Sequence, residues 1–159
     1  MKTRIVENIY KQEDFDLIVF DARDRLSNHA RVNKVGNKFA ESEVRDLVTS
    51  PLGFLGCGSW YVAYFEHVTA VYPHTDNDDP NMKCVTIIPL YWTTADDPHT
   101  IIHNETSESK VILKDRTSVT DEVDYRWALN SGVSFDANRL HSSDEFKGIK
   151  AGIQVIGYR

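Results

Sequence analysis

The sequence lacks several features that would each place it in a particular class of protein. It has no run of about 18 consecutive apolar residues, so we expect no membrane-spanning helix. Its first residues, MKTRIVENIYKQ, have no apolar core of the kind that signal peptides carry, which favours a cytoplasmic protein. Its net charge of −6 leaves no excess of lysine and arginine, and this disfavours nucleic acid as the main partner.

Cysteine is scarce as well. Cys57 and Cys84 are the only two in 159 residues, and they show no metal-ligand spacing. In a chain without an export signal, we interpret both as free thiols. The 41% hydrophobic and 26% charged residues are typical of a globular protein. Because no repeat, linker or low-complexity tract divides the chain, we expect one domain over residues 1–159.

The first 58 residues are expected to form a helical, buttressing part. Apolar residues recur at helical spacing from Phe15 to Leu26, and a shorter pattern around Val48 ends at Pro51. The glycine-rich segment GFLGCGSW then marks a turn.

From Trp60 onward the sequence is typical of β-strands. Aromatic and β-branched residues are concentrated in WYVAYFEHVTAVY, KCVTIIPLYW, SKVIL and GIKAGIQVIGY. Clusters such as DNDDPN, TADDPH and LNSG predict turns between them. We therefore predict a mainly β protein, a sandwich or open barrel of about eight strands with two N-terminal helices packed on one sheet.

His74 and Asp76, in the segment VYPHTDNDDP, are candidate metal ligands. A facial iron(II) site uses two histidines and one carboxylate and leaves coordination positions open. At the end of a strand, residues two apart leave on the same face and can converge on one ion. Alone, the triplet is more typical of a surface turn. The second histidine must come from elsewhere, and the candidates are His29, His67, His99, His103 and His141.

His141 is favoured by its surroundings, SGVSFDANRLHSSDEFKGIKAGIQVIGY. Gly132 is expected to open a strand that runs to His141, and a second strand follows a polar loop. Lys150 lies in this second, otherwise apolar strand, with Gly152 and Gln154 on the same face. An unpaired ammonium is costly to bury, so Lys150 either faces solvent or holds an anion.

These elements together resemble the iron(II)/2-oxoglutarate-dependent dioxygenases. The pattern comprises His-x-Asp, a Gly-x-x-x-Phe-Asp strand at residues 132–136, His141, and a basic residue nine positions later. The lysine in place of the commoner arginine is similar to the prolyl 4-hydroxylase branch. The resemblance covers residues 60–158. It implies a double-stranded β-helix (jelly roll) as the core, residues 59–159.

The resemblance also implies roles for individual residues. His74, Asp76 and His141 would bind Fe(II), and Lys150 would pair with the distal carboxylate of the co-substrate 2-oxoglutarate. A tyrosine and a threonine commonly assist the lysine in that branch. The matches are Tyr64, with Tyr61 and Tyr72 as rivals, and Thr100, which lies in DDPHTII where the branch has Gly-Gly-Glu-Thr.

The implied activity is hydroxylation coupled to decarboxylation of 2-oxoglutarate to succinate. Dioxygen and a prime substrate, either a peptide residue or a small molecule, are the other expected partners. Related halogenases lack the carboxylate ligand, so Asp76 disfavours halogenation. A cupin-type metalloprotein would favour a His-x-His pair followed closely by Glu, which HTDNDDPN lacks. A jelly-roll binding protein with a vestigial site is the alternative outside enzymes.

Two further expectations concern residues near this constellation. Arg139 shares strand parity with His141, so it faces the same cavity or forms a salt bridge at its rim. Trp92, Tyr125 and Trp127 are interpreted as packing residues.

Overall fold

The fold is described from a computed structural model, which defines residues 2–27, 35–38 and 43–159. His29, one of the candidate ligands, lies outside these ranges. Among the helices of the defined ranges, none is long and apolar enough to cross a membrane.

Three helical segments lie within the described part of residues 2–58. Helix α1 spans Gln12–Ser27, α2 spans Glu43–Thr49, and the 3₁₀ helix η1 spans Ser50–Leu55. The apolar positions that predict α1 are buried, including Phe15 and Ile18. Acidic residues lie in its first turn and an arginine in its last turn, an arrangement that complements the helix dipole.

In the defined ranges, ten strands form two antiparallel sheets, which confirms the mainly β prediction. Their bounds are β1 Arg4–Glu7, β2 Val35–Lys38, β3 Ser59–His67, β4 Val71–His74, β5 Met82–Trp92, β6 His99–Thr106, β7 Asp121–Arg126, β8 Ser131–Asp136, β9 Arg139–Ser143 and β10 Lys150–Tyr158. The larger sheet has the order β1-β8-β5-β10-β3-β2, and the smaller sheet has the order β4-β9-β6-β7.

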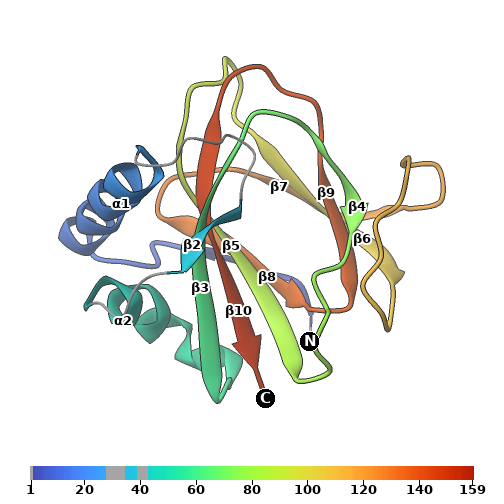
Figure 1. The fold of residues 1–159 in the computed structure, drawn as a ribbon, viewed down its shortest axis with the longest axis horizontal. Helices are drawn as coiled ribbons and strands as arrows, with labels where there is room; N and C mark the ends of the chain where they lie inside the picture. The colour runs from blue at the N-terminus through green and yellow to red at the C-terminus, as the bar shows by residue number, and fades with distance from the viewer. Residues whose placement is uncertain (1, 28–34, 39–42) are drawn as a thin grey trace.

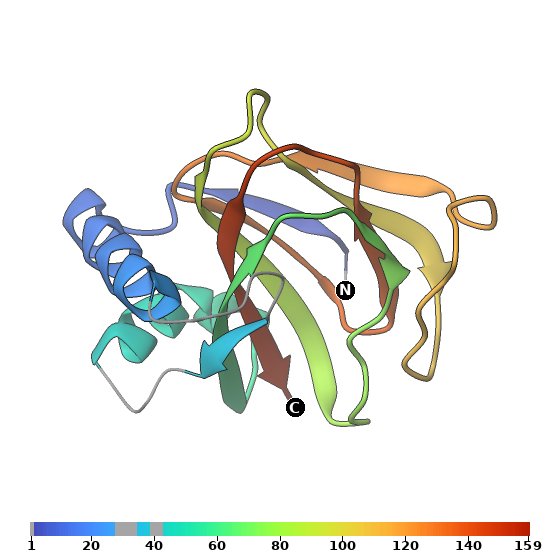
Figure 2. The same ribbon diagram turned by 45° about the horizontal axis from the view of Figure 1, so that its top comes forward.

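The molecule has three layers, with the larger sheet in the middle. Helices α1 and α2 lie on one side of this sheet, and the smaller sheet lies on the other side (Figures 1 and 2). One buried cluster joins the helices to the larger sheet, and it includes Ile18, Leu52, Tyr64 and Ile153. A second buried cluster lies between the two sheets. The larger sheet is therefore covered on both faces, and the cavity described below lies on its inner side.

The first 58 residues contain two strands that the sequence pattern does not predict. Strand β1 pairs with β8, and β2 pairs with β3, so both lie at the edges of the larger sheet. Each has only four residues, too few to show a period-two pattern. The expectation of a helical N-terminal part is therefore incomplete.

The single strand expected from Gly132 to His141 is wrong in detail. Strand β8 ends at Asp136, a turn follows at residues 137–138, and β9 begins at Arg139. Strand β8 belongs to the larger sheet and β9 to the smaller one. The chain thus crosses between the sheets here, and this crossing carries His141 to the side opposite Lys150.

The segment SKVIL, predicted as a strand, makes only an isolated bridge between Ile112 and His74. Its neighbours bond to the chain around that histidine. Thr75 N donates to Val111 O at 3.0 Å, and Leu113 N donates to Pro73 O at 2.8 Å. The segment therefore holds the end of β4 in place without extending the sheet regularly.

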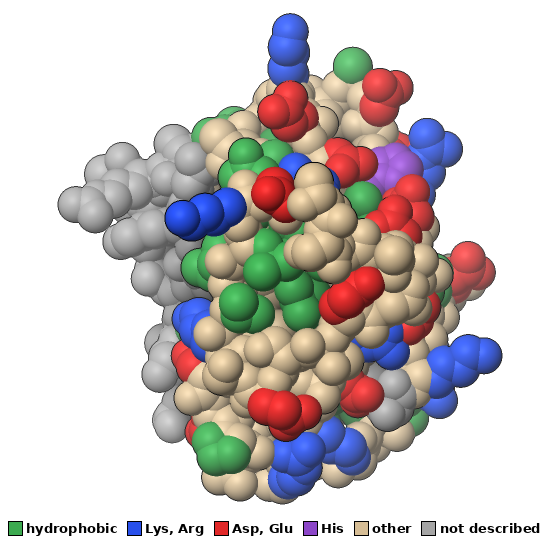
Figure 3. Space-filling model, turned by 90° about the vertical axis from the view of Figure 1, so that its right-hand side faces the viewer, with side chains coloured by type: hydrophobic (Ala, Val, Ile, Leu, Met, Phe, Trp, Pro, Cys, Tyr) green, Lys and Arg blue, Asp and Glu red, His purple; other side chains and the backbone are tan. Residues whose placement is uncertain are grey.

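The side of the molecule nearest the smaller sheet carries charges of both signs. Figure 3 shows acidic and basic side chains interspersed around a central group of hydrophobic side chains. Charge is therefore mixed across this face.

Candidate metal centre

Three predicted ligands, His74, Asp76 and His141, come together between the sheets. His74 ends β4 and lies directly opposite His141 of β9 in the antiparallel pair. Asp76 follows two residues after His74. One ligand atom from each residue can be chosen so that all three lie within 4.8 Å of one another. The structure therefore assembles the His-x-Asp…His set that the sequence predicts.

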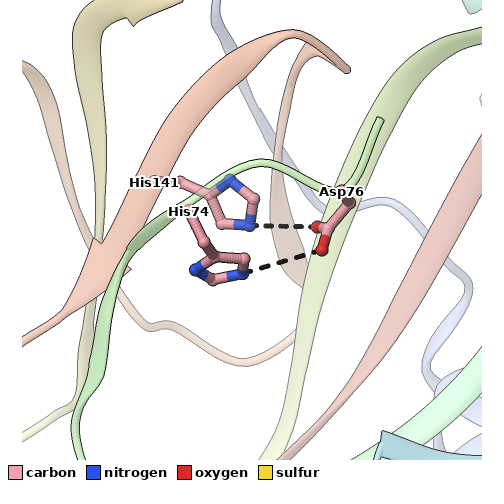
Figure 4. A group of neighbouring side chains, drawn as sticks. All are labelled: His74, Asp76 and His141. Atoms are coloured by element: carbon pink, nitrogen blue, oxygen red, sulfur yellow. Dashed lines mark ion pairs between the residues drawn. The ribbon is translucent and has the colours of Figure 1, made fainter. Parts of the chain in front are cut away.

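The two imidazoles face the carboxylate of Asp76 (Figure 4). His141 Nε2 lies 3.1 Å from Asp76 Oδ2, and His74 Nε2 lies 3.6 Å from Asp76 Oδ1. The centroids of the two rings are 4.2 Å apart. Nitrogen and oxygen donors thus converge on one small volume, as a single divalent ion requires.

Backbone carbonyls hold both rings in this orientation. His74 Nδ1 lies 2.8 Å from Tyr72 O, and His141 Nδ1 lies 3.3 Å from Arg139 O. His141 Nε2 also lies within hydrogen-bond distance of Asp76 Oδ2, which only accepts. A carbonyl oxygen likewise only accepts, so a neutral ring that donates to it from Nδ1 has its lone pair on Nε2. This is the tautomer that binds a metal through Nε2.

Gln154 of β10 holds the carboxylate. Its Nε2 donates to Asp76 Oδ2 at 2.9 Å across the space between the sheets. The period-two pattern of the strand places Gln154 on the face of Lys150, but it predicts no role for this residue. The sequence does contain a signal for such a role, because Gln154 and Lys150 are the two polar side chains in the otherwise apolar residues 150–157.

The protonation states suit metal binding. Burial and the neighbouring His141 lower the pKa of His74 to about 4, so its ring is neutral at pH 7. Burial alone would raise the pKa of Asp76, but the facing imidazoles of His141 and His74 outweigh it and lower this pKa to about 2. A neutral imidazole and an ionised carboxylate are the forms that coordinate divalent ions.

His74, Asp76 and His141 line a cavity of about 100 Å³. Its walls are largely apolar, with Phe65, Val71, Ile87 and Trp127 among the lining residues. The main polar group away from the metal ligands is Lys150, which is only 3% exposed. The cavity therefore joins a metal-ligand set to a buried cation.

The ammonium of Lys150 lies between two aromatic rings. Its Nζ is 5.2 Å from the ring centroid of Trp127 and 4.8 Å from that of Phe146. Burial lowers its pKa to about 8, opposed by the charge of Asp144. Within the defined part of the chain no carboxylate forms an ion pair with Lys150, and Asp144 pairs instead with Arg116 at 3.8 Å. Among the residues that the structure defines, this buried cation therefore has the charge of Asp144 nearby but no carboxylate at ion-pair distance.

Thr100, the expected assisting threonine, also lines the cavity. Its Oγ1 accepts a hydrogen bond of 2.8 Å from Trp127 Nε1, which leaves its hydroxyl proton available to another acceptor. Trp127 is therefore more than a packing residue, because it orients Thr100 and contacts Lys150. Trp127 follows directly after β7, in which Tyr125 pairs with Thr100 of β6. Because the sequence does not show this pairing of strands, it could not predict the contact between Trp127 and Thr100.

The structure excludes Tyr64 from the cavity. Its hydroxyl donates to Asp21 Oδ2 at 2.7 Å, and its ring belongs to the buried cluster beneath α1. The expectation that it assists Lys150 is wrong, because alternation along β3 directs Phe65 and His67 inward and Tyr64 toward the helices. Tyr72 is half exposed, with the guanidinium of Arg116 over its ring. Tyr61 packs against the cluster between the sheets.

The other described histidines have different partners. His99 Nδ1 lies 2.7 Å from Asp124, and His103 Nε2 lies 2.8 Å from Ser142 Oγ. His67 lines the cavity, where burial and the charge of Lys150 lower its pKa to about 4.

For Arg139 the sequence leaves two alternatives, a side chain in the cavity or a salt bridge at its rim, and the structure shows the salt bridge. Arg139 donates to His103 O and pairs with the carboxylate of Glu122. It is not among the residues that line the cavity.

Comparison with known proteins identifies the fold. No family model matches the sequence, and no curated protein matches it. Among solved structures, a prolyl-4-hydroxylase from Pseudomonas putida matches with a TM-score of 0.68 and 11% identity, over 99% of this chain and 92% of that one. The epimerase SnoN, solved with Fe3+, alpha-ketoglutarate and nogalamycin RO, matches with a TM-score of 0.68 and 11% identity, over 98% and 78%.

A third structure is the viral collagen prolyl hydroxylase from Paramecium bursaria Chlorella virus-1. It matches with a TM-score of 0.62 and 12% identity, over 99% of this chain and 91% of that one. At such identities the likeness is one of fold. The chain has the jelly-roll fold of these alpha-ketoglutarate-dependent and prolyl-hydroxylating enzymes, as the sequence resemblance implies.

Proposed function

We propose that this protein is an Fe(II)- and 2-oxoglutarate-dependent oxygenase, most specifically a hydroxylase. The observation that carries the proposal is one cavity that joins a His-Asp-His set to a buried lysine, which forms no ion pair with a carboxylate of the described residues. Structures of the same fold include two prolyl hydroxylases and an enzyme solved with Fe3+ and alpha-ketoglutarate, which supports the assignment.

The residues present fit an iron ion. His74, Asp76 and His141 would hold it, because two imidazoles and one carboxylate form the ligand set of non-haem Fe(II) oxygenases. When bound, the iron would supply the redox chemistry that couples oxygen reduction to decarboxylation of 2-oxoglutarate and oxidation of a second substrate. The protein's own contribution is to orient the donors through Tyr72 O, Arg139 O and Gln154.

Lys150 fits the far carboxylate of 2-oxoglutarate. The ammonium is fixed between two aromatic rings, and an ion pair in such a setting would fix the orientation of the dicarboxylate as well as its affinity. Thr100 would donate its free hydroxyl proton to the same carboxylate. The apolar walls would keep water away from the reacting groups.

Lys150 also separates this function from that of a binding protein with a vestigial site. A jelly roll that uses neither metal nor dicarboxylate has no use for a buried ammonium, which costs free energy to keep dry.

Anaerobic titration tests the proposal. Fe(II) would be titrated into the metal-free protein, and 2-oxoglutarate would then be titrated in, with binding followed by calorimetry. We expect one metal per chain in wild type and none in His141→Ala. In Lys150→Ala we expect metal affinity to be retained and 2-oxoglutarate affinity to fall about thirty-fold or more, since truncating one member of a buried charge pair costs about 2–5 kcal/mol.

The matched control is Lys147→Ala, which removes an exposed lysine from the loop before β10 and should behave as wild type. On admission of oxygen, the iron-loaded protein should release succinate slowly, and a screen of peptides and metabolites would identify the substrate that accelerates this release. An iron-loaded protein with neither 2-oxoglutarate binding nor turnover would refute the proposed function.

A further inference from the structure

The chain's only two cysteines meet on the face of the larger sheet that is turned toward the helices. Cys57 lies in the loop between η1 and β3, and Cys84 lies in β5. Their Sγ atoms are 3.6 Å apart, although 27 residues separate them in the sequence. Both are free thiols in this structure, as the sequence analysis expects. The two sulfurs need to approach by only about 1.5 Å to reach the length of a disulfide bond.

The surrounding backbone leaves room for these sulfurs. Gly157 of β10 pairs with Cys84, and a Cβ atom at position 157 would collide with Cys57 Sγ and lie 3.0 Å from Cys84 Sγ. On the other side, Gly56 ends η1 in the left-handed conformation, with φ of 67°. Lys83 Nζ donates to Leu55 O at 2.7 Å and to Gly56 O at 3.2 Å. Backbone and side chain together hold the Cys57 loop against β5.

We propose that Cys57 and Cys84 form a redox-sensitive dithiol that hydrogen peroxide closes to an intramolecular disulfide. In the first step the sulfur of Cys57 attacks one peroxide oxygen, the O–O bond breaks, and a sulfenic acid and one water result. In the second step the sulfur of Cys84 attacks the sulfenic sulfur, the S–S bond forms, and the hydroxyl leaves as a second water. Two thiols are oxidised by two electrons, and one peroxide is reduced to two waters.

The environments of the two sulfurs set the order of these steps. Cys57 is partly exposed, whereas Cys84 is fully buried. Burial and the adjacent Cys57 raise the pKa of the Cys84 thiol to about 12, so it is protonated and shielded from peroxide. Cys57 therefore reacts first, and Cys84 resolves the sulfenic acid.

Closure would join the helical side of the molecule to a central strand of the larger sheet. Cys84 belongs to the buried cluster beneath the helices, on the face of the sheet turned away from the metal centre. The disulfide should therefore stabilise the fold without changing metal binding. The proposal is independent of the proposed oxygenase function, and either can fail without the other.

Mass spectrometry after thiol alkylation tests the proposal. Reduced wild-type protein, unfolded in denaturant and treated with iodoacetamide, should carry two alkyl groups. After peroxide treatment of the folded protein it should carry none and should be two hydrogens lighter, still as a single chain. Its melting temperature should rise by about 10 °C and return to the starting value on reduction. Its Mn(II) affinity should stay the same.

Two serine variants test the order of the steps. Cys84→Ser should accumulate a sulfenic acid at Cys57 that a cyclic 1,3-diketone labels, whereas Cys57→Ser should react little. The proposal is overturned if wild type keeps two alkylatable thiols, gains oxygens without losing two hydrogens, or links two chains. It is also overturned if urea-unfolded wild type forms the disulfide as fast as the folded protein does, because the fold would then not accelerate the reaction of the two thiols.

Discussion

The environment of Lys150 is the strongest residue-scale argument for an anionic ligand. The residue is 3% exposed, and its ammonium lies against two aromatic rings and has no ion-pair partner among the described carboxylates. Cation–π contacts offset part of the cost of removing the charge from water but leave room for a better partner. A dicarboxylate bound between Lys150 and the metal ligands would provide that partner.

The pH dependence of 2-oxoglutarate binding should therefore follow the ionisation of Lys150. Burial lowers the pKa of Lys150 to about 8 in the unliganded protein, so the ammonium form is complete well below this pH and is lost above it. Because the dicarboxylate pairs with the ammonium form, its affinity should be level near pH 7 and fall by roughly tenfold per pH unit above pH 8.

Calorimetric titration of the Mn(II)-loaded protein from about pH 6.5 to 9.5 would measure this profile. Lys150→Arg is the matched control, because a guanidinium stays charged throughout, and its weaker binding should not vary across this range. The same slope in wild type and in Lys150→Arg would show that another group titrates.

Gln154 should influence metal affinity without being a ligand. Its amide donates to Asp76 Oδ2, so Gln154→Leu would free the carboxylate to rotate and leave the other Asp76 contacts in place. Loss of such an outer contact typically weakens metal binding by about 10–100-fold.

Titration with Mn(II) would measure the effect of Gln154→Leu. The chain's other glutamine, Gln12, makes a comparable bond of 2.8 Å to Asp16 on the exposed face of α1. Gln12→Leu is therefore the matched control and should bind metal as wild type does. Equal metal affinity in the two variants would contradict a positioning role for Gln154.

At the scale of elements, β3 illustrates why Tyr64 could not be placed from the sequence. The segment WYVAYF, residues 60–65, is apolar or aromatic on both faces, since the helices cover one face and the cavity lies behind the other. A strand buried on both sides has no polar face to fix its parity. Strand β10 could be placed, because Lys150 and Gln154 mark its cavity face while Ala151, Ile153 and Val155 pack toward the helices.

Tyr64→Phe should thus lower stability and leave ligand binding intact. The change removes the hydroxyl that donates to Asp21 and leaves the aromatic ring in its buried cluster. The expected loss in the free energy of unfolding is about 1–3 kcal/mol, because one partly buried hydrogen bond to a charged acceptor disappears. Urea unfolding would measure it, and calorimetry should give wild-type affinity for 2-oxoglutarate. If the variant had normal stability but bound 2-oxoglutarate poorly, Tyr64 would have the role in ligand binding that the structure excludes.

The crossing from β8 to β9 was also beyond the sequence pattern. The turn residues Ala137 and Asn138 include neither glycine nor proline, and the flanking residues continue a strand-like pattern. Asn138 favours a turn, but without glycine or proline beside it the signal is weak, and a single long strand is the simpler prediction. The position of His141 beside His74 and Asp76 was still predicted, because the prediction used spacing along the chain and did not depend on which sheet holds the strand.

At the scale of the whole molecule, the fold brings together residues that the sequence keeps apart. The candidate metal ligands come from β4, the loop after it and β9 of the smaller sheet, whereas Lys150 and Gln154 come from β10 of the larger one. The residue types and their order along the chain predicted that these residues lie together. The order of the strands in the two sheets could not be predicted from the sequence, because antiparallel pairs far apart in sequence leave no local signal. The fold also leaves the prime substrate open, since hydroxylases and an epimerase share it.

A site built from both sheets makes ligand binding a property of the folded chain as a whole. Metal and 2-oxoglutarate should bind the folded protein far more tightly than the unfolded one, because only folding brings the ligands together. At a free ligand concentration of one hundred times Kd, each should stabilise the fold by about 2.7 kcal/mol. For a chain of this size that corresponds to a rise in melting temperature of about 5–10 °C for each ligand.

Thermal unfolding under reducing conditions, with Mn(II) alone and then with Mn(II) and 2-oxoglutarate, would measure the two increments separately. Wild type and Lys147→Ala should show both increments. His141→Ala should lose the increment from Mn(II), whereas Lys150→Ala should keep it and lose the one from 2-oxoglutarate. This pattern requires the metal and the dicarboxylate to occupy adjoining parts of one cavity. If Lys150→Ala lost both increments, the lysine would be supporting the metal centre rather than a separate anion, and the division of roles between the two sheets would be wrong.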